Sequence, residues 1–122
     1  MAQSQISEAW RGKVCAILEG RIDGSTPDSV EWTQSALQDW DNESIGAPID
    51  DALEAILDVL QVAGALGRPM QLKYPPGEAW DFTTEYTTKY GTFTFYCKIC
   101  LLSAGDKIRI VSMHMPTKGT LR

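Results

Sequence analysis

The first half of the chain carries apolar residues at the three- and four-residue spacing of amphipathic helices. This spacing predicts helices over 5–19, 27–40 and 48–65. Ser4 and Thr26 are the expected N-caps of the first two helices. The third helix has the clearest pattern, because six apolar residues share one of its faces: Ile49, Leu53, Ile56, Leu57, Leu60 and Ala63.

In the second half of the chain the period changes to two, which is the spacing of half-buried β-strands. This pattern predicts four strands, over 70–74, 80–87, 92–102 and 107–115. Tight turns between the last three strands indicate an antiparallel meander with one face open to solvent. We therefore expect an α+β fold in a single domain, with N-terminal helices (1–66) packed on a C-terminal antiparallel β-meander (67–122).

Composition places the chain among ordinary globular proteins. Of its 122 residues, 43% are hydrophobic and 22% are charged. No apolar run approaches the roughly 20 residues that span a bilayer, and the first residues lack the pattern of a signal peptide. We therefore expect a cytoplasmic protein with no membrane partner.

Charge is distributed unevenly between the two halves. Residues 1–65 hold 3 basic and 12 acidic side chains, a balance of −9, whereas residues 66–122 hold 8 basic and 4 acidic side chains, a balance of +4. One interpretation is a solvated acidic face on the helices. The other is that the basic half binds nucleic acid, while the acidic half limits non-specific binding.

Cys97 and Cys100 form a C-x-x-C motif, a spacing that binds metal or acts in redox chemistry when it lies on a turn. Here the motif lies inside a predicted strand, so alternation places the two thiols on opposite faces. The chain also has a single histidine. We therefore expect two ordinary strand cysteines, with no metal and no cofactor.

Candidate functional residues gather on the last two predicted strands. Tyr96 and Lys98 share one parity of strand 92–102, where a cation beside an aromatic ring suits a phosphodiester and its base. A solvated sheet face is the plain alternative. Arg109 has the forked geometry that binds phosphate at two points. Lys73 and Lys118 are weaker candidates for contacts with RNA, and a plain surface charge is the alternative for each.

His114 is the candidate for proton transfer, because an unperturbed imidazole titrates near neutral pH. Strict alternation, however, groups His114 with Ile108 and Ile110, which are expected to be buried. The histidine reaches the open face only if the strand contains a bulge or bends near Pro116. A structural role in the core is the alternative.

The order of these patterns resembles the RelE/ParE superfamily of bacterial toxins. The stretches concerned are QLKY (71–74), AWDFTTEY (79–86), FTFYCKICLL (93–102) and IRIVSMHMPTKG (108–119). The sequence FYCKICLLSAGDKIRIVSMH also resembles the end of MqsR-type toxins. The resemblance covers about residues 50–120. It departs from the family pattern in lacking the arginine after the second strand and in its acidic net charge.

The resemblance implies a toxin of a toxin–antitoxin system that cleaves mRNA without a metal, on or off the ribosome, and that is bound by a cognate antitoxin. In this enzyme the 2′-hydroxyl attacks the adjacent phosphate. Lys98 and Arg109 would then stabilise charge on the phosphate, His114 would transfer protons, and Tyr96 would stack on a base or transfer a proton. Lys73 and Lys118 would contact the RNA backbone.

Two other classes of function fit the same sequence. The first is a small acidic binding protein, such as an inhibitor encoded by a phage or mobile element. It would imitate nucleic acid through one acidic cluster: Asp39, Asp41, Glu43, Asp50, Asp51, Glu54 and Asp58. The second is a catalytically silent sheet that binds another protein by its edge.

Overall fold

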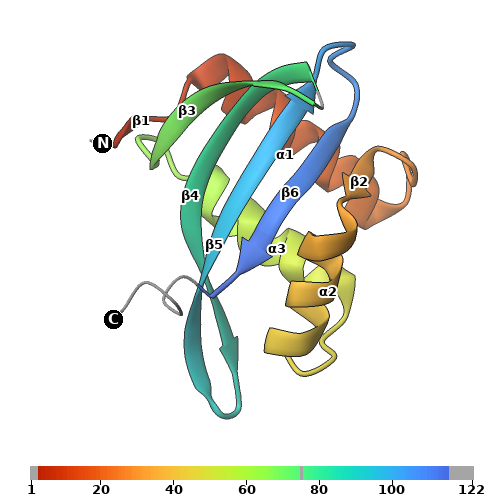
Figure 1. Ribbon diagram of the computed structural model, residues 1–122, viewed down its shortest axis with the longest axis vertical. Coiled ribbons are helices and arrows are strands. Elements are labelled where there is room, and N and C mark those ends of the chain that lie inside the picture. Colours follow the sequence, from red (N-terminus) through yellow and green to blue (C-terminus); the bar gives the residue numbers. More distant parts are fainter. Residues whose placement is uncertain (1–2, 75, 116–122) are drawn as a thin grey trace.

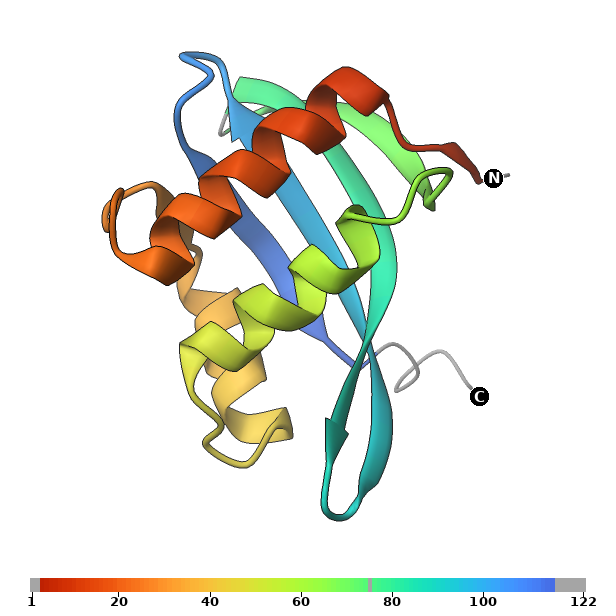
Figure 2. The same cartoon turned by 180° about the vertical axis from the view of Figure 1, so that it is seen from behind.

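A computed structural model describes residues 3–74 and 76–115 as a six-stranded sheet with three helices on one face (Figures 1 and 2). This arrangement confirms the α+β class. The strands are β1 (Ser4–Gln5), β2 (Val30–Trp32), β3 (Leu66–Lys73), β4 (Pro76–Thr88), β5 (Gly91–Leu102) and β6 (Ile108–His114), and the helices are α1 (Glu8–Asp23), α2 (Gln34–Glu43) and α3 (Ile49–Leu60).

The strands follow the order β1-β3-β4-β5-β6-β2. Strands β3 to β6 form an antiparallel meander, as the sequence predicted. Strand β2 corrects the expectation of a purely antiparallel sheet, because it lies parallel to β6, with Val30 opposite Ile108. The helices are also not confined to one N-terminal block, since β1 and β2 come from the same half of the chain.

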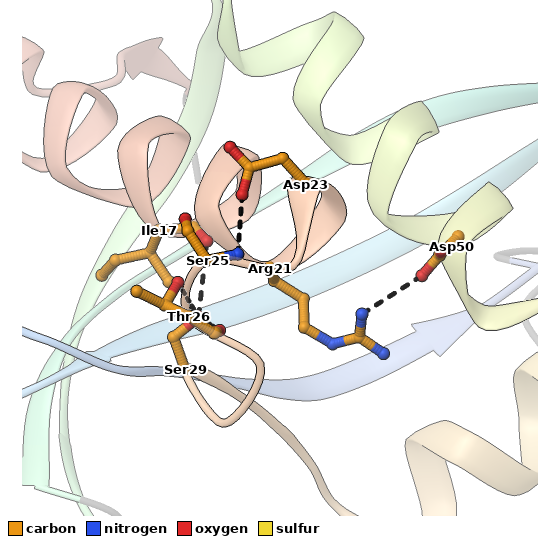
Figure 3. Close-up of polar contacts among 7 residues, drawn as sticks. All are labelled: Ile17, Arg21, Asp23, Ser25, Thr26, Ser29 and Asp50. Carbon is orange, nitrogen blue, oxygen red and sulfur yellow. Dashed lines mark hydrogen bonds and ion pairs between the residues drawn. The ribbon is translucent and has the colours of Figure 1, made fainter.

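The predicted helix over 27–40 is wrong in its first part. The chain turns after α1, and the Ser29 hydroxyl donates to the Thr26 carbonyl at 2.8 Å, as Figure 3 shows. Val30–Trp32 then pairs with β6 as strand β2. Helix α2 starts only after Thr33, whose side chain accepts a hydrogen bond from the Ala36 amide. Pairing with a distant strand therefore outweighs the local preference of this segment for helix.

The other helix boundaries also shift. Ser7, rather than Ser4, caps α1, because Ser4 and Gln5 form a short strand with β3. Helix α3 ends at Leu60, five residues before the predicted end. Between α1 and α3, Arg21 forms an ion pair with Asp50 at 3.5 Å (Figure 3).

Strand β3 starts at Leu66, before the predicted start at residue 70. It includes Pro69, which has no backbone N–H to donate to a neighbouring strand. Strand β1 pairs with β3 through Leu66 and Gly67 alone among the described residues, so Pro69 lies on an otherwise open edge. Proline is tolerated in a sheet at such a position.

The core lies between the sheet and the helices. Its largest fully buried side chains include Trp10 of α1, Trp40 of α2 and Phe95 of β5. The ring centroids of Trp40 and Phe95 are 5.1 Å apart. No helix in the described part of the chain is long and apolar enough to cross a membrane. The opposite face of the sheet carries no helix among the described elements (Figure 1).

Candidate functional site

The open face of the sheet gathers the polar side chains of β3 to β6 in neighbouring rows. One row crosses the sheet from Arg68 through Asp81 and Lys98 to Ser112. The next row brings Tyr96 opposite His114. These positions alternate with residues such as Cys97, which faces the helices and is fully buried.

A β-bulge in β6 places His114 on this open face. Ile110 pairs with Ile99 and Ser112 pairs with Lys98, so Val111 is an extra residue with no opposite partner. The extra residue reverses the alternation after Ile110. His114 therefore shares a face with Tyr96 instead of with Ile108 and Ile110, and the strict alternation assumed from the sequence does not hold in β6.

The local contacts of His114 orient its imidazole ring. The ring lies beside that of Tyr96, with centroids 5.2 Å apart and planes 37° apart. Its Nδ1 atom is 3.0 Å from the Met115 carbonyl oxygen. Because a carbonyl oxygen can only accept, Nδ1 carries the proton in this contact. In the neutral ring Nε2 is then an unprotonated nitrogen, as a general base requires.

Asp81 is the most buried charged group of the face, with 2% of its surface exposed. Nε and Nη2 of Arg68 donate to its two carboxylate oxygens at 2.9 and 2.7 Å, and the Tyr96 hydroxyl donates at 2.7 Å. Burial opposes ionisation, but the hydrogen bonds from Arg68 and Tyr96 outweigh it and lower the pKa of Asp81.

Tyr96 is held as a neutral donor in the same network. Burial, together with the hydrogen bond to Asp81, raises the pKa of Tyr96 to about 12. A phenol with this pKa does not accept a proton at neutral pH. Of the two roles predicted for Tyr96, proton transfer is therefore disfavoured at neutral pH, and stacking on a base stays a prediction.

Lys98 differs from the two arginines of this face. Within the described residues no hydrogen bond or ion pair engages its ammonium group, although its charge helps to lower the pKa of Asp81. Arg109, by contrast, donates from Nε and Nη2 to the same oxygen of Glu31, at 3.0 and 2.7 Å. Among the described cations of these two rows, together with Arg109, Lys98 is therefore the one that is available to a bound anion.

The remaining predicted residues lie apart from this cluster. Lys73 pairs with Pro76, five positions along the strand from the row of Asp81, which is ~17 Å at the usual strand rise. Lys118 lies outside the described residues. Cys97 and Cys100 face opposite sides of the sheet, as predicted, and burial raises the pKa of both thiols.

Arg68 and Asp81 are the site residues that the sequence did not identify. Asp81 stands between Trp80 and Phe82 in an alternating strand, so its parity alone placed it on the open face. Its burial depends on Arg68, which precedes the strand predicted at 70–74. The register between β3 and β4 brings them together, and no local pattern encodes that register.

The acidic cluster of residues 39–58 is partly engaged within the protein. Arg21 pairs with Asp50, the Tyr86 hydroxyl donates to Asp51 at 2.8 Å, and the Met115 amide donates to Glu43. These three carboxylates stabilise the fold. They are correspondingly less available to imitate a nucleic-acid backbone.

Comparisons with protein-family models, with curated proteins and with solved structures find no match to this chain.

Proposed function

We propose that the chain is a metal-independent endoribonuclease and that its active site is the open face around Lys98 and His114. The observation that carries this proposal is the bulge at Val111, because it brings the single histidine of the chain beside Tyr96 and one row from Lys98. A base, an available cation and an aromatic ring on one exposed face meet the requirements of RNA cleavage through the 2′-hydroxyl.

In the proposed reaction, Nε2 of His114 removes the proton of the 2′-hydroxyl. The 2′-oxygen then forms a bond to phosphorus while the bond to the 5′-oxygen breaks, and solvent protonates the leaving oxygen. The products are a 2′,3′-cyclic phosphate and a 5′-hydroxyl end. Lys98 stabilises the charge that develops on the phosphoryl oxygens, and the Asp81 network holds Tyr96 against the imidazole.

Arg109 contributes less directly in this proposal than the sequence suggested. Its guanidinium is bound to Glu31, so the pair adds little net charge to the face. We also propose that the fold is RelE-like and that the substrate is mRNA. In the same proposal, the protein acts as a toxin in bacteria and is bound by an antitoxin.

Removal of the Lys98 ammonium tests the proposal. Lys98→Ala should lower the cleavage rate of a labelled RNA about a hundredfold, the usual cost of losing one preorganised contact to developing charge. His114→Ala should also abolish cleavage, and wild-type activity should persist in EDTA. Mass spectrometry of the products should find the cyclic phosphate, and expression of the wild type should arrest bacterial growth.

Lys107→Ala is the matched control, because Lys107 is also a half-buried lysine but lies beyond the other end of β6. It should cleave like the wild type. Asp51→Ala is less suitable, since Asp51 accepts the hydrogen bond of Tyr86. If Lys98→Ala cleaves normally, or if the wild type cleaves no RNA with or without ribosomes, a non-catalytic binding protein becomes the better explanation.

A further inference from the structure

One edge of β4 lacks a strand partner over half of its length within the described structure. Strand β3 pairs with β4 from Lys73 opposite Pro76 to Arg68 opposite Asp81, and then diverges toward β1. Strand β5 covers the other edge of β4 to the end of the hairpin. Alternate backbone N–H and C=O groups between Phe82 and Thr88 therefore point to an edge without a strand partner.

A groove of about 740 Å³ follows this open edge. Its opposite wall is formed by the C-terminal end of α3 and the segment that leads into β3, which lie beside β4 in Figure 2. Its lining residues include Asp58, Val62, Leu66, Thr83 and Glu85.

The side chains of the groove differ between its two sides. On the helix side, Val62 and Leu66 are 59% and 52% exposed, which is high for apolar residues. On the sheet side, Thr83 and Glu85 share the parity of Asp81 and are exposed. Asp58 and Glu85 are the charged residues among the lining residues, and both are acidic.

This arrangement fits one kind of occupant. A strand added to β4 directs alternate side chains to the two faces of the sheet. Apolar side chains would then cover Val62 and Leu66, while basic side chains on the other face would lie opposite Glu85. The backbone of the added strand would satisfy the open hydrogen-bonding groups of β4.

A second copy of the chain fits less well. Symmetric antiparallel pairing along the whole open edge of Phe82–Thr88 would be centred on Glu85 and would place two Glu85 carboxylates opposite each other. Like charges in directly opposed positions destabilise a strand pair. The charge of the groove therefore favours a different, basic chain.

We propose that the open edge of β4 binds an extended segment of a partner protein, with alternating apolar and basic residues, by strand addition. This interaction is independent of RNA cleavage, because Glu85 and Val62 lie outside the cluster around Lys98. The partner segment would pair with β4 along Phe82–Thr88, beyond the last residue of β4 that pairs with β3.

Peptide binding to the full chain tests the proposal. The probe is a fluorescent peptide of about seven residues in which valine and lysine alternate, long enough to span the open edge at ~3.4 Å per residue. Two N-methylated versions of the peptide are compared. In one version the odd-numbered backbone amides are methylated, and in the other the even-numbered ones, so that only one version loses the amides that face β4. Strand addition predicts that one version binds like the parent and that the other binds about tenfold or more weakly.

Charge exchange provides the second test. Glu85→Lys should weaken binding of the lysine peptide about tenfold and should strengthen binding of a peptide with glutamate in place of lysine. Glu54→Lys, an exposed reversal on α3 that does not line the groove, should change neither affinity. Circular dichroism establishes that both variants are folded.

Three outcomes would overturn the proposal. The first is the absence of peptide binding up to about millimolar concentration, where even weak complexes are detectable. The second is equal binding of both N-methylated peptides. The third is hydrogen-exchange protection, in the free protein, of the β4 amides that point away from β5, which would mean that the chain itself, or a second copy, already occupies the edge.

Discussion

Asp81 remains charged inside the sheet because two neighbours supply three hydrogen bonds to its carboxylate. Arg68 provides two of them and a compensating charge, and Tyr96 provides the third. Removing any member leaves another polar group without its partner, which costs about 1–3 kcal/mol where the group is buried. These single residues fix the orientation of Tyr96, whose ring lies beside the imidazole of His114.

The same network makes Tyr96 a measurable reporter. Its pKa is raised to about 12, so the folded protein favours the neutral phenol. The stability gained in this way is present below the unfolded pKa of about 10 and is lost as pH rises through about 12. Ultraviolet titration should show that one of the four tyrosines ionises near pH 12, and Tyr96→Phe should remove that step. An unchanged high-pH step in Tyr96→Phe would contradict the assignment.

At the scale of elements, periodicity identified the parts of the fold that local sequence controls. The three strands of the hairpins and the buried face of α3 follow directly from alternating or helical spacing. Strand β2 does not, because Val30–Trp32 becomes a strand only when β6 is beside it. The bulge at Val111 likewise depends on pairing with β5. Because the bulge sets the face on which His114 lies, the position of His114 depends on this pairing too. Alternation along the strand therefore predicted that Tyr96 and Lys98 share the open face. The position of His114 and the pairing of Arg68 with Asp81 depend on the register between strands.

Thr33 joins these two non-local features. Its hydroxyl accepts from the Ala36 amide at the start of α2 and donates to the carbonyl of the bulge residue Val111 at 3.0 Å. Thr33→Ala loses both contacts and should lower the free energy of unfolding by about 1–2 kcal/mol, the usual cost of removing an N-cap. Urea denaturation would measure the loss. Thr33→Ser keeps the hydroxyl and should retain most of the stability, so equal destabilisation by serine would assign the effect to the lost methyl group instead.

At the scale of the whole molecule, the uneven charge of the sequence corresponds to the two faces of the sheet. The helices, which hold most of the acidic residues, cover one face of the sheet (Figures 1 and 2). The strand register places Arg68, Lys98 and Arg109 on the other face. Internal ion pairs with Asp81 and Glu31 neutralise both arginines. The open face therefore presents few available cations, which predicts weak, salt-sensitive RNA binding rather than the strong non-specific binding of a highly basic protein.

The salt dependence of RNA binding tests this distribution of charge. For single strands, the logarithm of the binding constant falls against the logarithm of salt concentration with a slope of about −0.7 for each phosphate neutralised. If Lys98 contacts a phosphate, Lys98→Ala should reduce the magnitude of the slope by about 0.7. Lys107→Ala should leave the slope unchanged. Lys107 directly precedes the first residue of β6, whereas His114 is the last residue of that strand.

Fluorescence anisotropy with a short single-stranded RNA would measure the slopes between about 50 and 200 mM salt, a range over which phosphate contacts change affinity strongly. A catalytically inactive His114→Ala background prevents cleavage during the measurement and keeps the lysines in place. Equal slopes for Lys98→Ala and its parent would mean that Lys98 meets no phosphate. The open face would then not be the RNA-binding surface, even if the protein cleaves RNA elsewhere.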